Sequence, residues 1–127
     1  MENFNKCSCS CSAGPKLIFA CSGASNLGHI SDQAARQLTK EGVGKMYCLT
    51  GIGGRVNPIM VNTQAASKIL AIDGCELDCA KSCLQQAGFD HFEHLRLSDL
   101  GMKKAVTLVD ADSINKVVAQ GKEKLEC

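Results

Sequence analysis

The residues best suited to chemistry in this chain are its nine cysteines. They occur at positions 7, 9, 11, 21, 48, 75, 79, 83 and 127. A thiolate can bind a soft metal ion, attack an electrophile or take part in thiol redox chemistry. An odd number of cysteines argues against a complete disulfide framework. In a reducing compartment, clustered cysteines are more often metal-binding or catalytic.

The rest of the composition narrows the class of protein. A chain of 127 residues that is 45% hydrophobic can bury the core of one domain. Fourteen Lys and Arg residues against thirteen Asp and Glu give a formal charge of +1, so no charge excess favours nucleic acid or an anionic membrane. Aromatic residues are scarce, at 4%, which disfavours stacking on single-stranded nucleic acid.

The start of the chain differs from the remainder. Segment 1–14 is a Cys/Ser-rich tail that carries Cys7, Cys9 and Cys11 without apolar periodicity, so we expect it to be flexible. It does not resemble a secretory signal, and no later segment is apolar for long enough to span a bilayer. We therefore expect a cytoplasmic protein, with one α/β domain over 15–127.

Apolar runs and turn residues alternate along this domain. They predict strands at 16–20, 45–49, 68–72 and 91–97, and helices at 29–41, 58–67, 76–87 and 110–125. Segments 50–56 and 98–104 are expected to be loops, whereas 105–109 fits a strand or a helix equally well. This alternation predicts a three-layer, Rossmann-like α/β fold, in which a parallel sheet of about four strands has helices on both faces.

The predicted strands bring several cysteines to one edge of the sheet. Cys21, Cys48 and Cys75 lie at or just after the ends of three strands, and the carboxyl ends of parallel strands share one edge. Cys79 follows Cys75 by four residues, so both would project from one face of the predicted helix 76–87. Four such thiolates can close a tetrahedral shell at about 2.3 Å from a zinc ion.

Neighbouring residues suit such a site. Four thiolates around a divalent cation carry net negative charge, which the start of a helix and backbone N–H groups at nearby glycines would stabilise. Ser22 could donate to a sulfur or simply cap a loop, and Lys103 and Lys104 could offset the charge or be solvated. Asp73 could orient a ligand, or it could cap the following helix.

Each cysteine also has a plainer interpretation, because free cysteines often pack as small hydrophobic residues. Cys48, inside an apolar run, fits that interpretation best of the four, whereas Cys75 and Cys79 are favoured as ligands. Cys83 lies one helical turn further on and is expected in the core, with a fifth thiol or a substitute ligand as the alternative. Among the histidines, His91 and His94 would face opposite sides of a strand and cannot pair.

Several of these motifs together resemble the DGC family, which is named for the tripeptide at Asp73-Gly74-Cys75. The similarity covers roughly residues 16–118 and leaves out the Cys7, Cys9 and Cys11 tail. It is carried by Ile72-Asp73-Gly74-Cys75, Cys79-Ala80, Cys21-Ser22-Gly23, Ser25, Gly28, Ala35-Arg36, Leu84, Ala87-Gly88, Ser98-Asp99-Leu100-Gly101 and Lys103-Lys104. The resemblance implies zinc binding through four chelating cysteines, which correspond to Cys21, Cys48, Cys75 and Cys79. It implies no reaction.

Three functions remain open from the sequence. The first is binding of zinc, or a related thiophilic ion, for metal sensing or handling. The second is a thiol redox or sulfur-transfer enzyme that uses Cys75 and Cys79, and the third is an iron–sulfur carrier. A phosphatase-type Cys-x5-Arg loop is absent, because Leu27 stands where the arginine would follow Cys21. The sequence identifies no protein partner.

Overall fold

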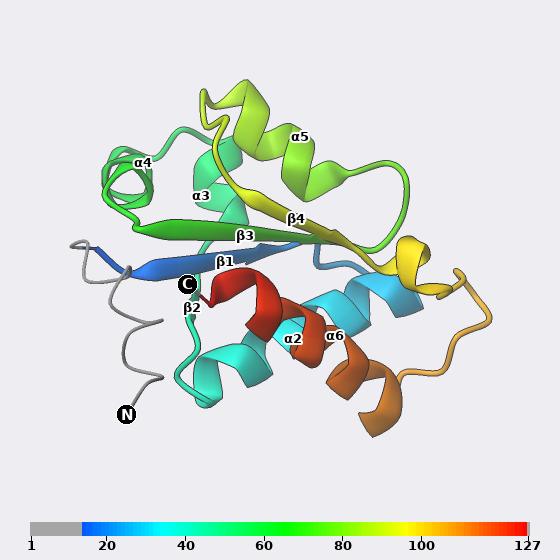
Figure 1. Cartoon of the computed structure of the whole chain (residues 1–127). Coiled ribbons are helices and arrows are strands. Elements are labelled where there is room, and N and C mark those ends of the chain that lie inside the picture. Colours follow the sequence, from blue (N-terminus) through cyan, green and yellow to red (C-terminus); the bar gives the residue numbers. More distant parts are fainter. Residues whose placement is uncertain (1–13, 127) are drawn as a thin grey trace, which may run out of the picture.

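The computed structural model describes residues 14–126, so the predicted tail with Cys7, Cys9 and Cys11, and also Cys127, lie outside the described residues. Four parallel strands form one sheet in the order β2-β1-β3-β4 (Figure 1). Their bounds are β1 Lys16–Ala20, β2 Lys45–Met46, β3 Lys68–Asp73 and β4 Glu93–Arg96. The two central strands are almost entirely buried, as expected for apolar strands covered on both faces.

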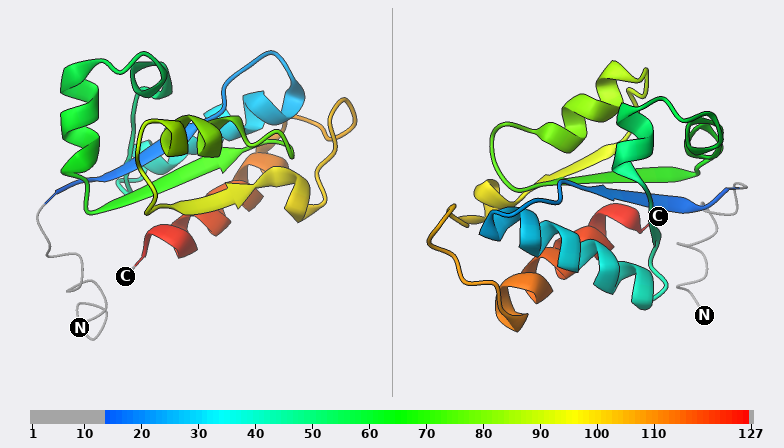
Figure 2. Two further views of the ribbon diagram at one scale, coloured as in Figure 1. Left: turned by 90° about the horizontal axis from the view of Figure 1, so that it is seen from above. Right: turned by 180° about the vertical axis from the view of Figure 1, so that it is seen from behind.

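Helices cover both faces of the sheet and confirm the predicted three-layer α/β fold. Helices α2 (Asn26–Lys40) and α6 (Ala111–Leu125) lie on one face, whereas α3 (Leu49–Gly53), α4 (Asn57–Gln64) and α5 (Cys79–Gln86) lie on the other (Figures 1 and 2). Side chains of β1 alternate between the two layers: Ile18 packs in the α2/α6 core, and Phe19 packs in the core beneath α5.

After the two central strands, the chain crosses to opposite faces of the sheet. β1 is followed by α2 on one face, and β3 is followed by α5 on the other face. In an open parallel sheet, the loops after two such strands part and leave a crevice at the carboxyl edge. The loops that contain Cys21 and Cys75 are the two that flank this crevice.

The region around Cys48 differs from the prediction. β2 ends at Met46, and the expected loop at 50–56 contains the short helix α3, with Cys48 as its N-cap residue. The Cys48 Sγ accepts a hydrogen bond from the Gly51 N–H at 3.3 Å. Cys48 is exposed, so its interpretation as a core residue is wrong. The side-chain cap explains why this glycine-rich segment forms a helical turn.

Helix α5 begins later than predicted. It starts at Cys79 rather than at residue 76, so Cys75 lies in a turn and does not share a helix face with Cys79. Asp78 has a left-handed backbone with φ of 52°, which breaks the helix on its N-terminal side. Cys75 and Cys79 therefore approach the sheet edge from two different local structures.

The remaining elements follow the prediction with shifted ends. The helix expected at 29–41 is α2 and that at 58–67 is α4. The strand expected at 91–97 is β4, and the last helix is α6, capped by Asp110. The loop at 98–104 contains a 3-10 turn, η2 (Leu97–Leu100), and 105–109 forms neither strand nor helix. Among the helices between residues 14 and 126, none is long and apolar enough to cross a membrane.

Candidate metal centre

Cys21 lies directly after β1. Its sulfur contacts the backbone of the turn Asp73-Gly74-Cys75 at the end of β3, which we call the DGC turn. Its backbone N–H donates to the Ile72 carbonyl at 3.0 Å, which continues the β1–β3 pairing by one residue. Its Sγ accepts a hydrogen bond from the Gly74 N–H at 3.1 Å and lies 3.8 Å from the Ser31 Oγ. Burial raises the pKa of the Cys21 thiol, and the Gly74 N–H offsets part of that rise.

Three of the cysteines border a cleft of about 250 Å³ at this edge of the sheet, which we call the inner cleft. Cys21, Cys75 and Cys79 all line it, together with Leu49 and Lys104. Cys21 and Cys75 are half-buried, and Cys79, the first residue of α5, is exposed. Three of the four predicted ligands thus reach one cavity, with a lysine at its border.

Cys48 borders a neighbouring cleft of about 630 Å³, which we call the outer cleft. Cys79 and Cys83 line this cleft as well, and Cys83 also packs against the apolar core beneath α5, in line with its expected core position. Ser22, Leu49 and Cys79 line both clefts, which makes the two cavities adjacent. Cys79 is the cysteine common to both.

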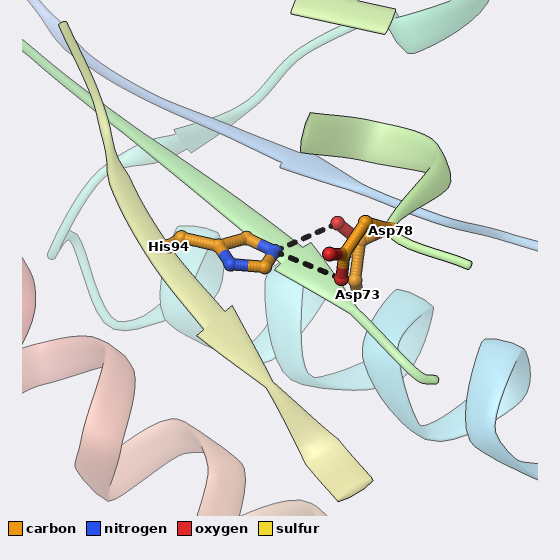
Figure 3. Close-up of side chains that lie close together, drawn as sticks. All are labelled: Asp73, Asp78 and His94. Carbon is orange, nitrogen blue, oxygen red and sulfur yellow. Dashed lines mark hydrogen bonds and ion pairs between the residues drawn. The ribbon is translucent and has the colours of Figure 1, made fainter. Parts of the chain in front are cut away.

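In the described part of the chain, the cysteine sulfurs do not gather as tightly as metal ligands would. Between residues 14 and 126, the only group of three or more potential ligands with atoms all within 4.8 Å of one another is Asp73, Asp78 and His94. Figure 3 shows His94 reaching from β4 toward Asp73 at the end of β3 and Asp78 before α5.

The carboxylates of this trio already accept hydrogen bonds from protein donors. Both Asp73 oxygens accept backbone hydrogen bonds, from Ala80 N–H at 2.7 Å and Lys81 N–H at 3.0 Å. Arg96 donates to both oxygens of Asp78, at 2.8 and 2.6 Å, and this contact lowers the pKa of Asp78. These contacts hold the start of α5 against the ends of β3 and β4.

Asp73 caps α5 from the end of β3, which confirms its structural interpretation. Its side chain is 1% exposed and also contacts the His94 Nε2 at 2.9 Å. The role of His94 is not visible in the sequence, because this contact depends on the register between β3 and β4. His94 pairs with Ala71, and Asp73, two residues further along β3, faces the same side of the sheet.

The other residues considered beside the site have different roles. The Ser22 hydroxyl donates to the Asp32 carboxylate at 2.9 Å and not to a sulfur. Lys104 lines the inner cleft, and its loop is held by Asn26, which donates to the Lys103 and Thr107 carbonyls at 3.0 and 2.8 Å. The loop after η2 thus places Lys104 at the border of the inner cleft.

Gly74 provides a test of how closely the DGC turn must approach α2. An added Cβ at Gly74 would lie 2.7 Å from the Leu27 Cβ and 3.2 Å from its carbonyl carbon. We expect Gly74→Ala to lower the free energy of unfolding by about 1–3 kcal/mol, because backbone must shift. Gly23→Ala is the matched control, since nothing lies within 4 Å of its added Cβ. Urea unfolding measures both variants, and equal losses would contradict the close approach.

Comparisons of the sequence with known proteins identify the family of this chain. The profile of the DGC domain matches residues 17–120. The chain is also 38% identical over 88 residues to the anaerobic and virulence modulator AnvM of Pseudomonas aeruginosa, a match that covers 69% of this chain and 67% of that protein. No solved structure matches. On the profile match and this relative, the chain belongs to the DGC domain family.

Proposed function

We propose that this protein binds a thiophilic metal ion, zinc, through Cys21, Cys48, Cys75 and Cys79, and that it acts in metal sensing or handling. The proposal rests on the observation that these four cysteines line two adjacent clefts at the carboxyl edge of the sheet. They come from the loops after three different strands and from the start of α5, and they line two adjacent clefts that share Cys79. Thiolates are the ligands that structural zinc sites use most.

The surroundings fit a negatively charged thiolate centre. Backbone N–H groups of Gly74 and Gly51 donate to the sulfurs of Cys21 and Cys48. Lys104 lines the inner cleft, and Cys79 lies at the N-terminal, positive end of the eight-residue helix α5. Hydrogen bonds and positive charge of this kind stabilise metal-bound thiolates.

Formation of one shell requires side-chain movement, because the sulfurs are further apart than ligands of one ion. Cys48 and Cys79 are exposed, so each can change its rotamer without displacing core atoms, although Cys48 would give up its hydrogen bond from the Gly51 N–H in doing so. Binding of structural zinc provides about 10–16 kcal/mol in zinc-finger peptides at neutral pH, far more than rotation of two side chains requires. The half-buried Cys21 and Cys75 would act as the fixed half of the site.

Family membership supports the same proposal, since the DGC resemblance implies chelating cysteines. The Pseudomonas relative is named for anaerobic conditions and virulence. Oxidation of thiolate ligands releases the metal that they hold. A cysteine–zinc centre would therefore suit a protein whose state differs between reducing and oxidising conditions, and we extend this to the present chain as part of the proposal.

The direct test is elemental analysis of the full chain, purified without oxygen in the presence of a reductant. We expect at least about one zinc per chain and no visible absorption. Strong visible absorption with bound iron would indicate an iron–sulfur carrier instead. Protein that is metal-free as purified and does not take up added zinc would contradict the proposal. Rapid alkylation of Cys75 in such protein would then favour a thiol enzyme.

A further inference from the structure

We propose that a third cleft, beside the inner cleft, binds a small carboxylate with an apolar body. This cleft, which we call the lysine cleft, has a volume of about 490 Å³ and is lined by Lys103 and Lys104. Cys75 borders both the lysine cleft and the inner cleft, so the ligand would lie next to the thiols. The inference does not depend on the proposed function, because the groups assigned to the carboxylate are not thiols.

The walls of the lysine cleft are largely apolar. Leu27 and Met102, which belong to the core of the α2/α6 layer, form part of them, together with Leu77. The Leu77 side chain is 72% exposed, and a ligand that covers it removes apolar surface from water. The cleft therefore favours a ligand with an aliphatic body over a fully hydrated ion such as phosphate.

The charges along the lysine cleft favour a monoanion. Lys103 and Lys104 line it with one acid, Glu76, which leaves one positive charge without a counterpart. Both lysines are exposed, and within residues 14–126 neither forms an ion pair with a carboxylate. A carboxylate on the ligand supplies the missing negative charge and accepts charge-assisted hydrogen bonds from an ammonium group.

A buried hydroxyl offers the second polar contact. Ser98 lines the lysine cleft but not the inner cleft, and its Oγ is buried without a hydrogen-bond partner in the described part of the chain. Its backbone N–H donates to the Gly74 carbonyl at 3.1 Å, which fixes the residue beside the DGC turn. A buried hydroxyl without a partner costs free energy. It can donate to one carboxylate oxygen while a lysine pairs with the other.

The backbone that carries the two lysines is held in place by protein contacts. Asn26 donates to the Lys103 and Thr107 carbonyls, and its Oδ1 accepts from the Ala105 N–H at 2.9 Å. The Thr107 Oγ1 also accepts from the Lys103 N–H at 2.7 Å. Ala105 has a φ of 65°, which a residue other than glycine keeps only where its surroundings enforce it. A loop that is already ordered lowers the entropic cost of binding a ligand.

The test titrates the full-length protein with butanoate, hexanoate and octanoate, and with octan-1-ol as the uncharged counterpart of octanoate. In isothermal titration calorimetry, the affinity should rise about three- to fourfold for each added methylene. Octanol should bind at least about 10-fold more weakly than octanoate, because it lacks the charge that pairs with the lysines. Equal binding of octanoate and octanol, an affinity that does not depend on chain length, or no binding would overturn the inference.

Variants locate the binding site. Lys103→Gln/Lys104→Gln should weaken octanoate binding at least about 10-fold. The charge-matched control Lys40→Gln/Lys116→Gln, which changes exposed residues of α2 and α6, should alter it by less than about twofold. Ser98→Ala should weaken binding about fivefold without lowering the melting temperature, because the hydroxyl has no protein partner to lose. Equal losses in the two lysine pairs, or an unchanged affinity in Ser98→Ala, would overturn the site. Zinc content is counted separately, so this inference and the proposed function can fail independently.

Discussion

Replacing both Cys75 and Cys79 by serine is expected to weaken zinc binding by at least about 100-fold. A serine hydroxyl stays protonated at neutral pH and is a poor ligand for a thiophilic ion. The double variant removes two of the three sulfurs of the inner cleft and the only sulfur that also lines the outer cleft. Competition with a chromophoric chelator measures the affinity of the variant and of the unchanged protein under the same anaerobic conditions.

The matched control replaces the tail cysteines Cys7, Cys9 and Cys11 by serine. It removes more thiols than the double variant and should keep the affinity of the unchanged chain within a few-fold, because the domain cysteines are intact. Unchanged affinity in the Cys75→Ser/Cys79→Ser protein would contradict the metal centre. A loss only in the tail variant would place the ion on the tail instead.

The second large effect is expected from Asp73→Ala, which should lower the free energy of unfolding by about 3 kcal/mol. The variant leaves the Ala80 and Lys81 N–H groups without their carboxylate acceptor and removes the partner of His94. Since Asp73 is buried, water does not readily replace it. Chemical denaturation at neutral pH measures the loss, and hydrogen exchange should show it first at the start of α5.

Two further variants test the cause of that loss. Asp73→Asn keeps one carbonyl acceptor, so it should be clearly less destabilising than Asp73→Ala. Asp99→Ala removes an exposed carboxylate that contacts Arg96 at 3.3 Å and should change stability by no more than about 0.5 kcal/mol. Equal effects of Asp73→Ala and Asp99→Ala would show that the capping contacts contribute little.

The Asp73 variant also connects the fold to the proposed site. Asp73 fixes the first turn of α5, and Cys79 is the first residue of that helix. We therefore expect Asp73→Ala to weaken zinc binding as well, although it removes no sulfur. In this view, the DGC tripeptide combines a helix cap, a close approach to α2 and a thiol in three consecutive residues.

Local sequence patterns predicted the order of strands and helices in the domain. Apolar runs such as 16–20 and 68–72 predicted the two central strands, and their alternation with helices predicted a parallel sheet covered on both faces. The placement of cysteines after strand ends then predicted which thiols would reach one edge. These features depend on burial and on the shared direction of parallel strands. Residue type and spacing indicate both.

The details of the site depended on contacts between distant segments. The start of α5 is set by a carboxylate seven residues before Ala80, and the helix at Cys48 needs a sulfur cap and a glycine packed against Ile59. The pairing of Asp73 with His94 requires the register of two strands that a whole helix separates. The sequence by itself determined the strands, the helices other than α3, and the edge of the sheet that the cysteine-bearing loops share. Only the tertiary structure decided that Cys79 belongs to two clefts and that Cys83 lines one of them, because those distances are set by how α3 and α5 pack on the sheet.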